Sequence, residues 1–257
     1  MKRSIAAAPE PMKRSMATAA GLLAGSVVAM VVAVGPPLHE ASEELFAWHM
    51  VQHLVLVNVA APLLAAGLAD PALFAALPWA WRRSARGWVR SAHRLPGEAV
   101  AIGAWLSHVV VLWAWHAPAL YEAALRLPAI HALEHVTLFA TATLFWAMVL
   151  GARGLVPLGS AAALLYLFAA AGQSTALGAL LALTAVSSYT IHAETAARWG
   201  LTALEDQQLA GLIMWALGSI GYLAAALRTL AAGLRDAGRH PRAAPAPAPQ
   251  ASSTPPS

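Results

Sequence analysis

Long apolar runs separated by short polar segments dominate this chain. Helices that cross the roughly 30 Å hydrocarbon core of a bilayer need about 20 apolar residues. Because a membrane span must satisfy its backbone hydrogen bonds internally, each such run predicts a transmembrane helix. We therefore expect an all-α fold, a polytopic transmembrane helix bundle of about six spans. The expected spans are residues 17–35, 45–67, 98–117, 131–150, 156–187 and 207–231.

The spans divide the chain into three parts. Residues 1–16 form a basic cytoplasmic segment, residues 17–231 the transmembrane domain, and residues 232–257 a cytoplasmic tail that ends in an Ala-, Pro- and Ser-rich stretch and should be disordered. The first apolar run has an alternative interpretation as a cleaved signal peptide. We favour a retained helix, because the run is long for a signal peptide and no clear small-residue cleavage motif follows it.

Composition agrees with a membrane protein. Hydrophobic residues make up 59% of the chain and charged residues 11%, whereas soluble domains have about 25% charged residues. The chain has no cysteine, which excludes disulfides, iron–sulfur clusters and thiolate metal sites.

The basic residues sort by membrane side. With six spans and both termini inside, all Lys and Arg residues except Arg126 and Arg198 fall on the cytoplasmic side, as the positive-inside rule expects. Residues 68–97, which carry five arginines and three tryptophans, should lie on the membrane surface against lipid phosphates. The net charge of +4 therefore reflects topology, and we expect no nucleic-acid partner.

Histidines are the chemically informative residues of the spans. His49 and His53 lie four residues apart in the second span, and His131 and His135 repeat this spacing in the fourth. An i,i+4 pair lies on one helix face, about one turn (~5.4 Å) apart. Ionisable side chains are costly in a membrane and mark functional sites by default. The expected orientation places both pairs in the outer half of the bilayer.

A lone membrane histidine often only bonds a neighbouring helix, but two pairs at one depth favour a metal-binding cluster. His39 and His192 are equally well explained as solvated loop residues, and His93 and His240 lie on the cytoplasmic side. Met50 and Met214 are soft donors that more often serve packing. The candidate metal ligands are His49, His53, His108, His116, His131, Glu134 and His135.

Three functions suit such a cluster. Imidazole binds copper, zinc, iron and nickel, so a membrane copper-binding protein is one interpretation. Paired histidines on facing helices also hold haem iron, which would make the chain a membrane electron carrier. A copper or proton transporter is less favoured, because few polar residues line the inner half of the spans. The chain contains no nucleophile–base arrangement, phosphate-binding loop or dinucleotide fingerprint, so we expect no enzyme.

Four segments of the chain together carry a family resemblance. The chain resembles the multi-span CtaG family of cytochrome c oxidase assembly factors over residues 40–227. Many relatives have seven spans, whereas we count six here. The segments are, in order, HMVQHLVLVNVAAPLLAAG, WHAPALYEAAL, HALEHVTLFATATLFW and GLTALEDQQLAGLIMW.

The resemblance implies a role in maturing the oxidase, through copper supply to its copper centres as a chaperone. Its partners would be cytochrome c oxidase subunits and membrane lipid, and the sequence leaves a homo-oligomer open. The implied location is the bacterial inner membrane, with the metal site facing the periplasm. The matching positions are His49, His53, His116, His131, Glu134, His135, Asp206 and Gln207.

Overall fold

The computed structural model describes residues 10–76, 78–92, 94–151 and 158–239 and is all-helical over these ranges. Within these ranges, six helices are long and apolar enough to cross a membrane, which confirms the expected fold class. The spanning elements are α1 (Glu10–Val34), the continuous run of α3 (Phe46–Val55), η1 (Leu56–Ala60) and α4 (Ala61–Leu68), α7 (Gly97–Trp115), α9 (Pro128–Leu150), α10 (Ser160–Leu183) and α12 (Ala203–Arg239). Shorter helices connect them: α2 (Leu38–Glu44), α5 (Pro71–Ala76), α6 (Trp79–Ala92), α8 (Pro118–Arg126), η2 (Thr190–His192) and α11 (Ala193–Arg198).

The helix ends differ from the expected spans in several places. α1 begins at Glu10 and α12 at Ala203, ahead of the expected residues 17 and 207, because a helix can extend past the apolar run into polar residues, and α10 begins at Ser160 rather than at residue 156. α9 begins at Pro128, because proline is favoured in the first helical turn, where its missing N–H costs nothing. α10 ends at Leu183, short of the apolar run that continues to residue 187. α12 continues to Arg239, so residues 232–239, expected in the tail, are helical. The rest of the expected disordered tail, residues 240–257, lies outside the described residues, as do residues 1–9 of the N-terminal segment.

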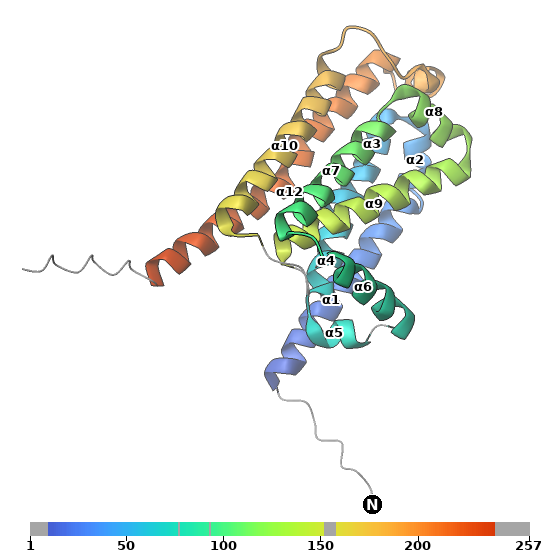
Figure 1. Ribbon diagram of the computed structural model, residues 1–257. Coiled ribbons are helices and arrows are strands. Elements are labelled where there is room, and N and C mark those ends of the chain that lie inside the picture. The colour runs from blue at the N-terminus through green and yellow to red at the C-terminus, as the bar shows by residue number, and fades with distance from the viewer. Residues whose placement is uncertain (1–9, 77, 93, 152–157, 240–257) are drawn as a thin grey trace, which may run out of the picture.

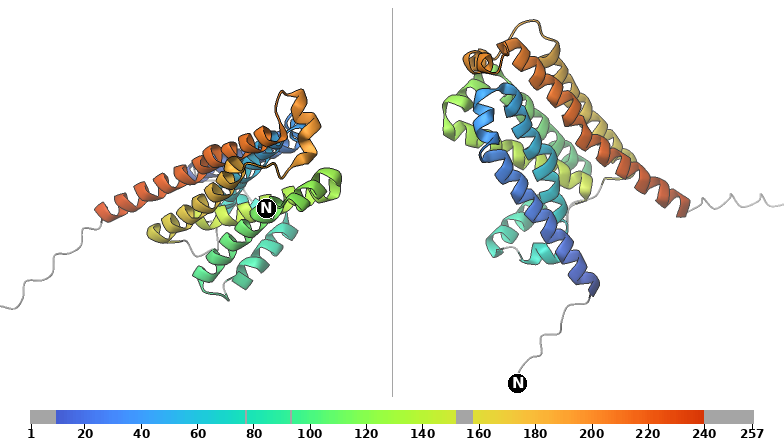
Figure 2. Two further views of the ribbon diagram at one scale, coloured as in Figure 1. Left: turned by 90° about the horizontal axis from the view of Figure 1, so that it is seen from above. Right: turned by 180° about the vertical axis from the view of Figure 1, so that it is seen from behind.

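The spans form one bundle in which the two described ends of the chain lie on the same side (Figures 1 and 2). α2, α8 and α11 gather at the opposite end of the bundle, at the top of Figure 1. α12 packs against α10 and α3, α9 packs against α4 and α7, and α1 packs against α4 and η1. An even number of spans requires this placement of the chain ends.

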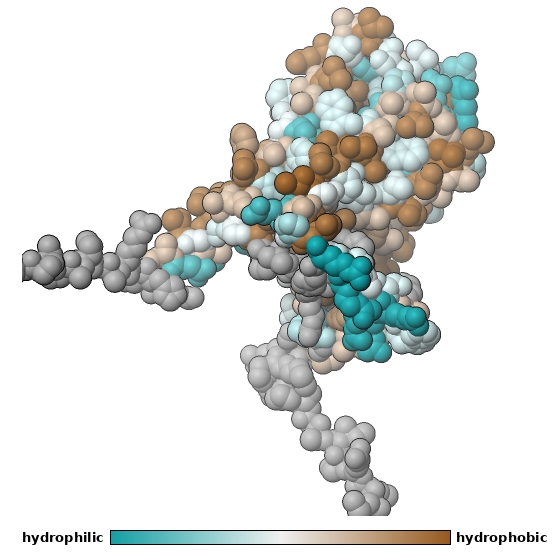
Figure 3. All heavy atoms as spheres, viewed as in Figure 1, coloured by the Kyte–Doolittle hydropathy of each residue, from teal (hydrophilic) through white to brown (hydrophobic). Residues whose placement is uncertain are grey.

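The face of the bundle seen in Figure 3 is mostly apolar or intermediate in hydropathy, and hydrophilic side chains gather over the region of α6 and at the upper right of the view. Exposed side chains on the spans include Val110, Val136, Leu165 and Phe168, which suits contact with lipid tails. α6 carries Arg83, Arg86 and Arg90, all exposed. The arginine-rich end of the bundle is therefore the end away from α2, α8 and α11.

Two glycines allow a close contact between α10 and α12. A Cβ atom added to Gly211 would lie 2.6 Å from the backbone oxygen of Gly178 and 2.5 Å from the backbone nitrogen of Ala182. Membrane helices lack a hydrophobic driving force between them and associate by such small-residue packing. The absence of side chains at Gly178 and Gly211 is thus what allows these two backbones to touch.

The second span contains a π-helical turn, η1, ahead of Pro62. Within it the Ala61 N–H bonds to the Leu56 carbonyl. Pro62 has no N–H to offer, so the Val57 carbonyl loses its helical donor. The indole N–H of Trp146 on α9 donates to that oxygen at 2.8 Å instead. The π turn therefore ties the second span to α9 through a side chain.

We expect Gly211→Ala to destabilise the protein by about 1–3 kcal/mol, because the new methyl group overlaps backbone atoms that cannot move independently. Thermal unfolding in detergent measures the effect. Gly172→Ala on α10 is the matched control, since a Cβ there meets nothing within 4 Å and alanine favours the helix. Equal melting temperatures for the two variants would contradict the close contact.

Candidate metal centre

Five side chains from α3 and α9 converge between these two helices. We call them the histidine–glutamate cluster: His49, His53, His131, Glu134 and His135. Their ring centroids lie 4.4 Å apart for His49–His53 and for His131–His135, 5.3 Å for His49–His131 and 5.5 Å for His53–His135. The i,i+4 spacing in each helix places each pair on one face, and the fold brings these two faces together, which the sequence alone left open.

The carboxylate of Glu134 lies at the centre of the cluster. One oxygen is 3.6 Å from His49 Nε2 and the other is 3.5 Å from His53 Nε2. Both Glu134 and His49 are fully buried. A charged or polar group in such a place is stable only when it is paired or bound to a cation.

The donor atoms of the cluster lack ordinary hydrogen-bond partners. Buried polar atoms in proteins are nearly always bonded. Several atoms of the cluster, however, have no hydrogen-bond partner within the described residues. These atoms are Nδ1 and Nε2 of His49 and of His53, Nε2 of His131 and of His135, and both carboxylate oxygens of Glu134. This concentration of unpaired lone pairs fits a bound cation better than a packed core.

The geometry also fits a first-row metal ion. His49, His131 and Glu134 each offer one ligand atom, and these atoms lie within 4.8 Å of one another. A tetrahedral ion bonded to nitrogen and oxygen at about 2.0–2.1 Å holds its ligand atoms roughly 3.3–3.4 Å apart. The glutamate–histidine distances are already close to that value, so small side-chain shifts complete a site.

Asp206, at the start of α12, holds the beginning of α3. Its two carboxylate oxygens accept the backbone N–H groups of Phe46 and Ala47 at 2.8 and 2.9 Å. The first N–H groups of a helix have no partner within it, and an acidic group there is favoured by the helix dipole. Asp206 therefore positions the helix that carries His49 and His53 and is not itself in the cluster.

Gln207 and Gln52 fix the neighbouring helices. Gln207 accepts the Ser188 N–H at 2.7 Å and donates to the Leu181 carbonyl, which joins α12 to the end of α10. Gln52 donates to the Ala33 carbonyl at 2.8 Å and joins α3 to α1. Gln52 lies between the two histidines of α3, and sequence reasoning missed its role.

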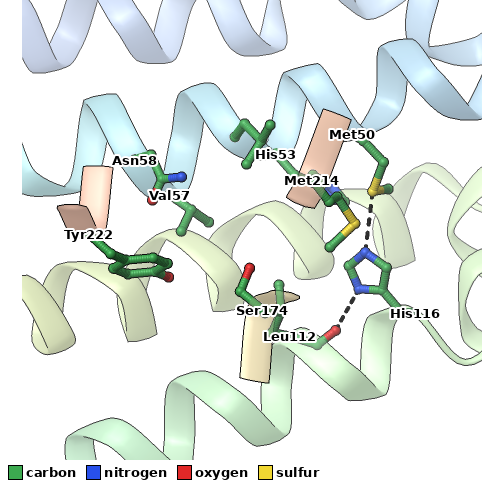
Figure 4. A pocket seen from close by; sticks show the side chains of 10 residues that line it. Met50, His53, Val57, Asn58, Leu112, His116, Ser174, Met214 and Tyr222 are labelled. Carbon is green, nitrogen blue, oxygen red and sulfur yellow. Dashed lines mark hydrogen bonds between the residues drawn. The ribbon is translucent and has the colours of Figure 1, made fainter. Parts of the chain in front are cut away.

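His116 lies beside the cluster at the end of α7. Its Nδ1 is 2.7 Å from the Leu112 carbonyl and its Nε2 is 3.2 Å from the sulfur of Met50 (Figure 4). Its backbone carbonyl accepts the Tyr189 hydroxyl. No ring contact joins His116 to the cluster histidines in the part of the chain that the structure describes.

The structure does not place His108 with the other candidate ligands. Its ring packs on Phe145 and its Nδ1 lies 3.5 Å from the Thr141 hydroxyl. Phe145 follows His135 by ten residues on α9, which is about 15 Å along the helix. The structure therefore does not bring His108, a predicted ligand, into the cluster, because its neighbours on α9 lie further along the helix than His135.

His192, expected to be as plausibly solvated as functional, is buried. Its Nε2 is 2.7 Å from the Tyr121 hydroxyl, and burial lowers the pKa of this histidine despite the nearby Asp206 carboxylate. Tyr121 in turn packs its ring on His49 at 5.0 Å. The segment of η2 and α11 thus folds back over the cluster, and the apolar neighbours Tyr189 and Ile191 are the sequence signal for it.

A cavity of about 240 Å³ reaches the cluster from the surface. His39, Glu43, His131 and His135 are among the residues that line it. The Glu43 side chain is 63% exposed, and the His39 ring stacks on that of His131. Polar groups therefore extend from the surface of α2 to the cluster.

These features define a class: a multi-pass membrane protein with a buried histidine–carboxylate group near one end of its bundle. A family model described as cytochrome c oxidase caa3 assembly factor (Caa3_CtaG) matches residues 8–236, and the chain belongs to this family. It is thus a membrane assembly factor for cytochrome c oxidase, which indicates a non-catalytic role and an interaction with the oxidase. Neither the curated proteins nor the solved structures contain a match.

Replacing Asp206 should loosen the start of α3. We expect Asp206→Ala to destabilise the protein by about 1–3 kcal/mol, because two buried N–H groups lose a charged acceptor. Asp206→Asn keeps one acceptor oxygen and should fall between the wild type and the alanine variant. Thermal unfolding in detergent gives the order, and an unchanged melting temperature in Asp206→Ala would contradict the capping role.

Proposed function

We propose that this protein binds copper at the histidine–glutamate cluster and delivers or holds it during maturation of a copper centre of cytochrome c oxidase. The observation that carries the proposal is the convergence of ring nitrogens and carboxylate oxygens that have no other hydrogen-bond partner among the described residues. Family membership supplies the oxidase as the partner. The unpartnered nitrogen and oxygen atoms of the cluster are the basis for proposing a bound metal ion.

Copper suits these donors best among the metals of the oxidase. Divalent copper binds nitrogen and oxygen sites more tightly than the other first-row divalent metals. The cluster offers four imidazoles and one carboxylate on two helices, enough for a complete site with donors to spare. Spare donors favour transfer, because an incoming ligand can replace one histidine while the others still hold the ion.

The site lies at the end of the bundle opposite the arginine-rich α6. By the positive-inside rule that end faces outward, in the periplasm of a bacterial inner membrane. The cavity lined by His39 and Glu43 then opens toward the compartment that supplies copper. Glu43 at its mouth adds negative charge that attracts a cation.

Haem is a weaker alternative for the same histidines. Bis-histidine ligation needs a flat slot for the porphyrin between two imidazoles. The cluster rings instead pack against one another at centroid distances of 4.4–5.5 Å, which leaves no such slot. A transporter is also less favoured, since it needs polar groups along the whole path across the membrane.

Copper analysis of the purified protein tests the proposal. We expect close to one cupric ion per chain in the wild type when copper is bound in air. His53→Ala and His135→Ala should each weaken binding by at least about tenfold, because even changes in groups that only orient ligands cost about 10–100-fold in affinity. Elemental analysis after dialysis against a competing chelator measures both quantities.

His108→Ala is the matched control, since His108 is equally buried but lies outside the cluster. The His108→Ala variant should bind as much copper per chain as the wild type. A metal-free wild type that refuses added copper would refute the proposal, and a Soret band with full histidine dependence would favour haem. In cells that lack the protein, the oxidase should regain its copper with the wild type or His108→Ala and not with His53→Ala.

A further inference from the structure

Met50 and His116 make a contact that the cluster does not use. Met50 follows His49 on α3, and its sulfur lies 3.2 Å from Nε2 of His116. The other ring nitrogen of His116 is 2.7 Å from the Leu112 carbonyl oxygen. A carbonyl oxygen only accepts, so Nδ1 must carry the proton in this contact.

The Nε2–sulfur contact therefore brings two acceptors together. With the proton on Nδ1, a neutral His116 ring presents a lone pair at Nε2. The thioether sulfur of Met50 is also an electron-pair donor to metals and a weak acceptor. No hydrogen lies between them, whereas a cation bound to both atoms would make the same geometry favourable.

A third donor faces the same place from another helix. Met214 on α12 lines a small cavity together with Met50, His53 and His116. In the view of Figure 4 the side chain of Met214 extends into the same cavity as the Met50 sulfur and the His116 ring. The cavity measures about 20 Å³, room for about one water molecule or one ion, and Met50, His116 and Met214 are all buried.

We propose that Met50, His116 and Met214 form a second metal site, selective for monovalent copper, next to the histidine–glutamate cluster. Thioether sulfur is a soft ligand that selects Cu(I) over harder cations. The inference rests on the proposed function, because both sites concern the same metal. His53 lines this cavity and also lies 3.5 Å from the Glu134 carboxylate, so one residue borders both sites.

Packing alone explains a buried methionine elsewhere in the bundle. Met148 on α9 is as buried as Met50, and both belong to the hydrophobic core, as does Met214. Methionine fills core gaps well, and its sulfur often contacts the edges of aromatic rings. Met50 differs because its sulfur meets a ring nitrogen, and because a second methionine and a cavity lie at that point.

X-ray absorption at the copper edge tests the second site. The full-length protein in detergent is loaded with Cu(I) under anaerobic, reducing conditions. We expect sulfur scattering in the wild type and none in the double variant Met50→Leu/Met214→Leu. Silver(I), a probe without redox chemistry, should bind the double variant at least about tenfold more weakly. Leucine has nearly the volume of methionine, so the fold should persist, which thermal unfolding checks.

Met148→Leu is the control and should keep both the sulfur scattering and the silver affinity. Cupric copper bound in air should be the same in the wild type and the double variant, since the cluster is intact. Copper bound through nitrogen and oxygen alone in the reduced wild type would overturn the second site and leave the proposed function standing. Sulfur scattering that survives in the double variant would also overturn it. A protein that binds neither form of copper would refute both proposals.

Discussion

Polar groups inside a membrane have no water to bond, and this constraint shapes every part of the bundle. The Val57 carbonyl, freed by the π turn, accepts the indole of Trp146. Ser26 donates to the Ala60 carbonyl and Asn58 to the Gly218 carbonyl. Each of these bonds joins two different spans. The demand for partners thus becomes the means by which the helices are held in register.

The histidine–glutamate cluster stands out against this background. In the described part of the chain, unpartnered nitrogen and oxygen atoms are densest at the crossing of α3 and α9. The supports of the cluster come from far along the chain: Asp206 holds α3 from α12, and His192 meets Tyr121 beside His49. The site is therefore a product of the whole bundle, although its donors come from only two helices.

Sequence reasoning succeeded where one helix suffices and failed where two must be placed together. Apolar length predicts the spans, and the i,i+4 spacing places His49 with His53 and His131 with His135 on common faces. Residue numbers give the depth of a side chain along its own helix but not its depth relative to another helix. On this basis His108 was grouped with the cluster, although the structure packs it on Phe145, far along α9 from His135. The role of Asp206 depends on a contact across 160 residues, which no local pattern encodes. Gln52 and Met50 sit inside the histidine motif, yet their partners Ala33 and His116 are defined only by the fold.

The π turn at residues 56–60 has a consequence for how the second span is compared with related chains. A π turn accommodates one extra residue and so rotates everything after it by about 100° relative to an uninterrupted α-helix. The half that carries His49 and His53 and the half that carries Ala61 and Ala65 therefore follow two different helical phases. A one-residue deletion within the turn would leave an uninterrupted α-helix in which His49 and His53 keep the face that points to α9. A one-residue gap aligned at this point therefore keeps the angular position of the histidines, whereas the same gap elsewhere in the span would rotate them by about 100° relative to its other half.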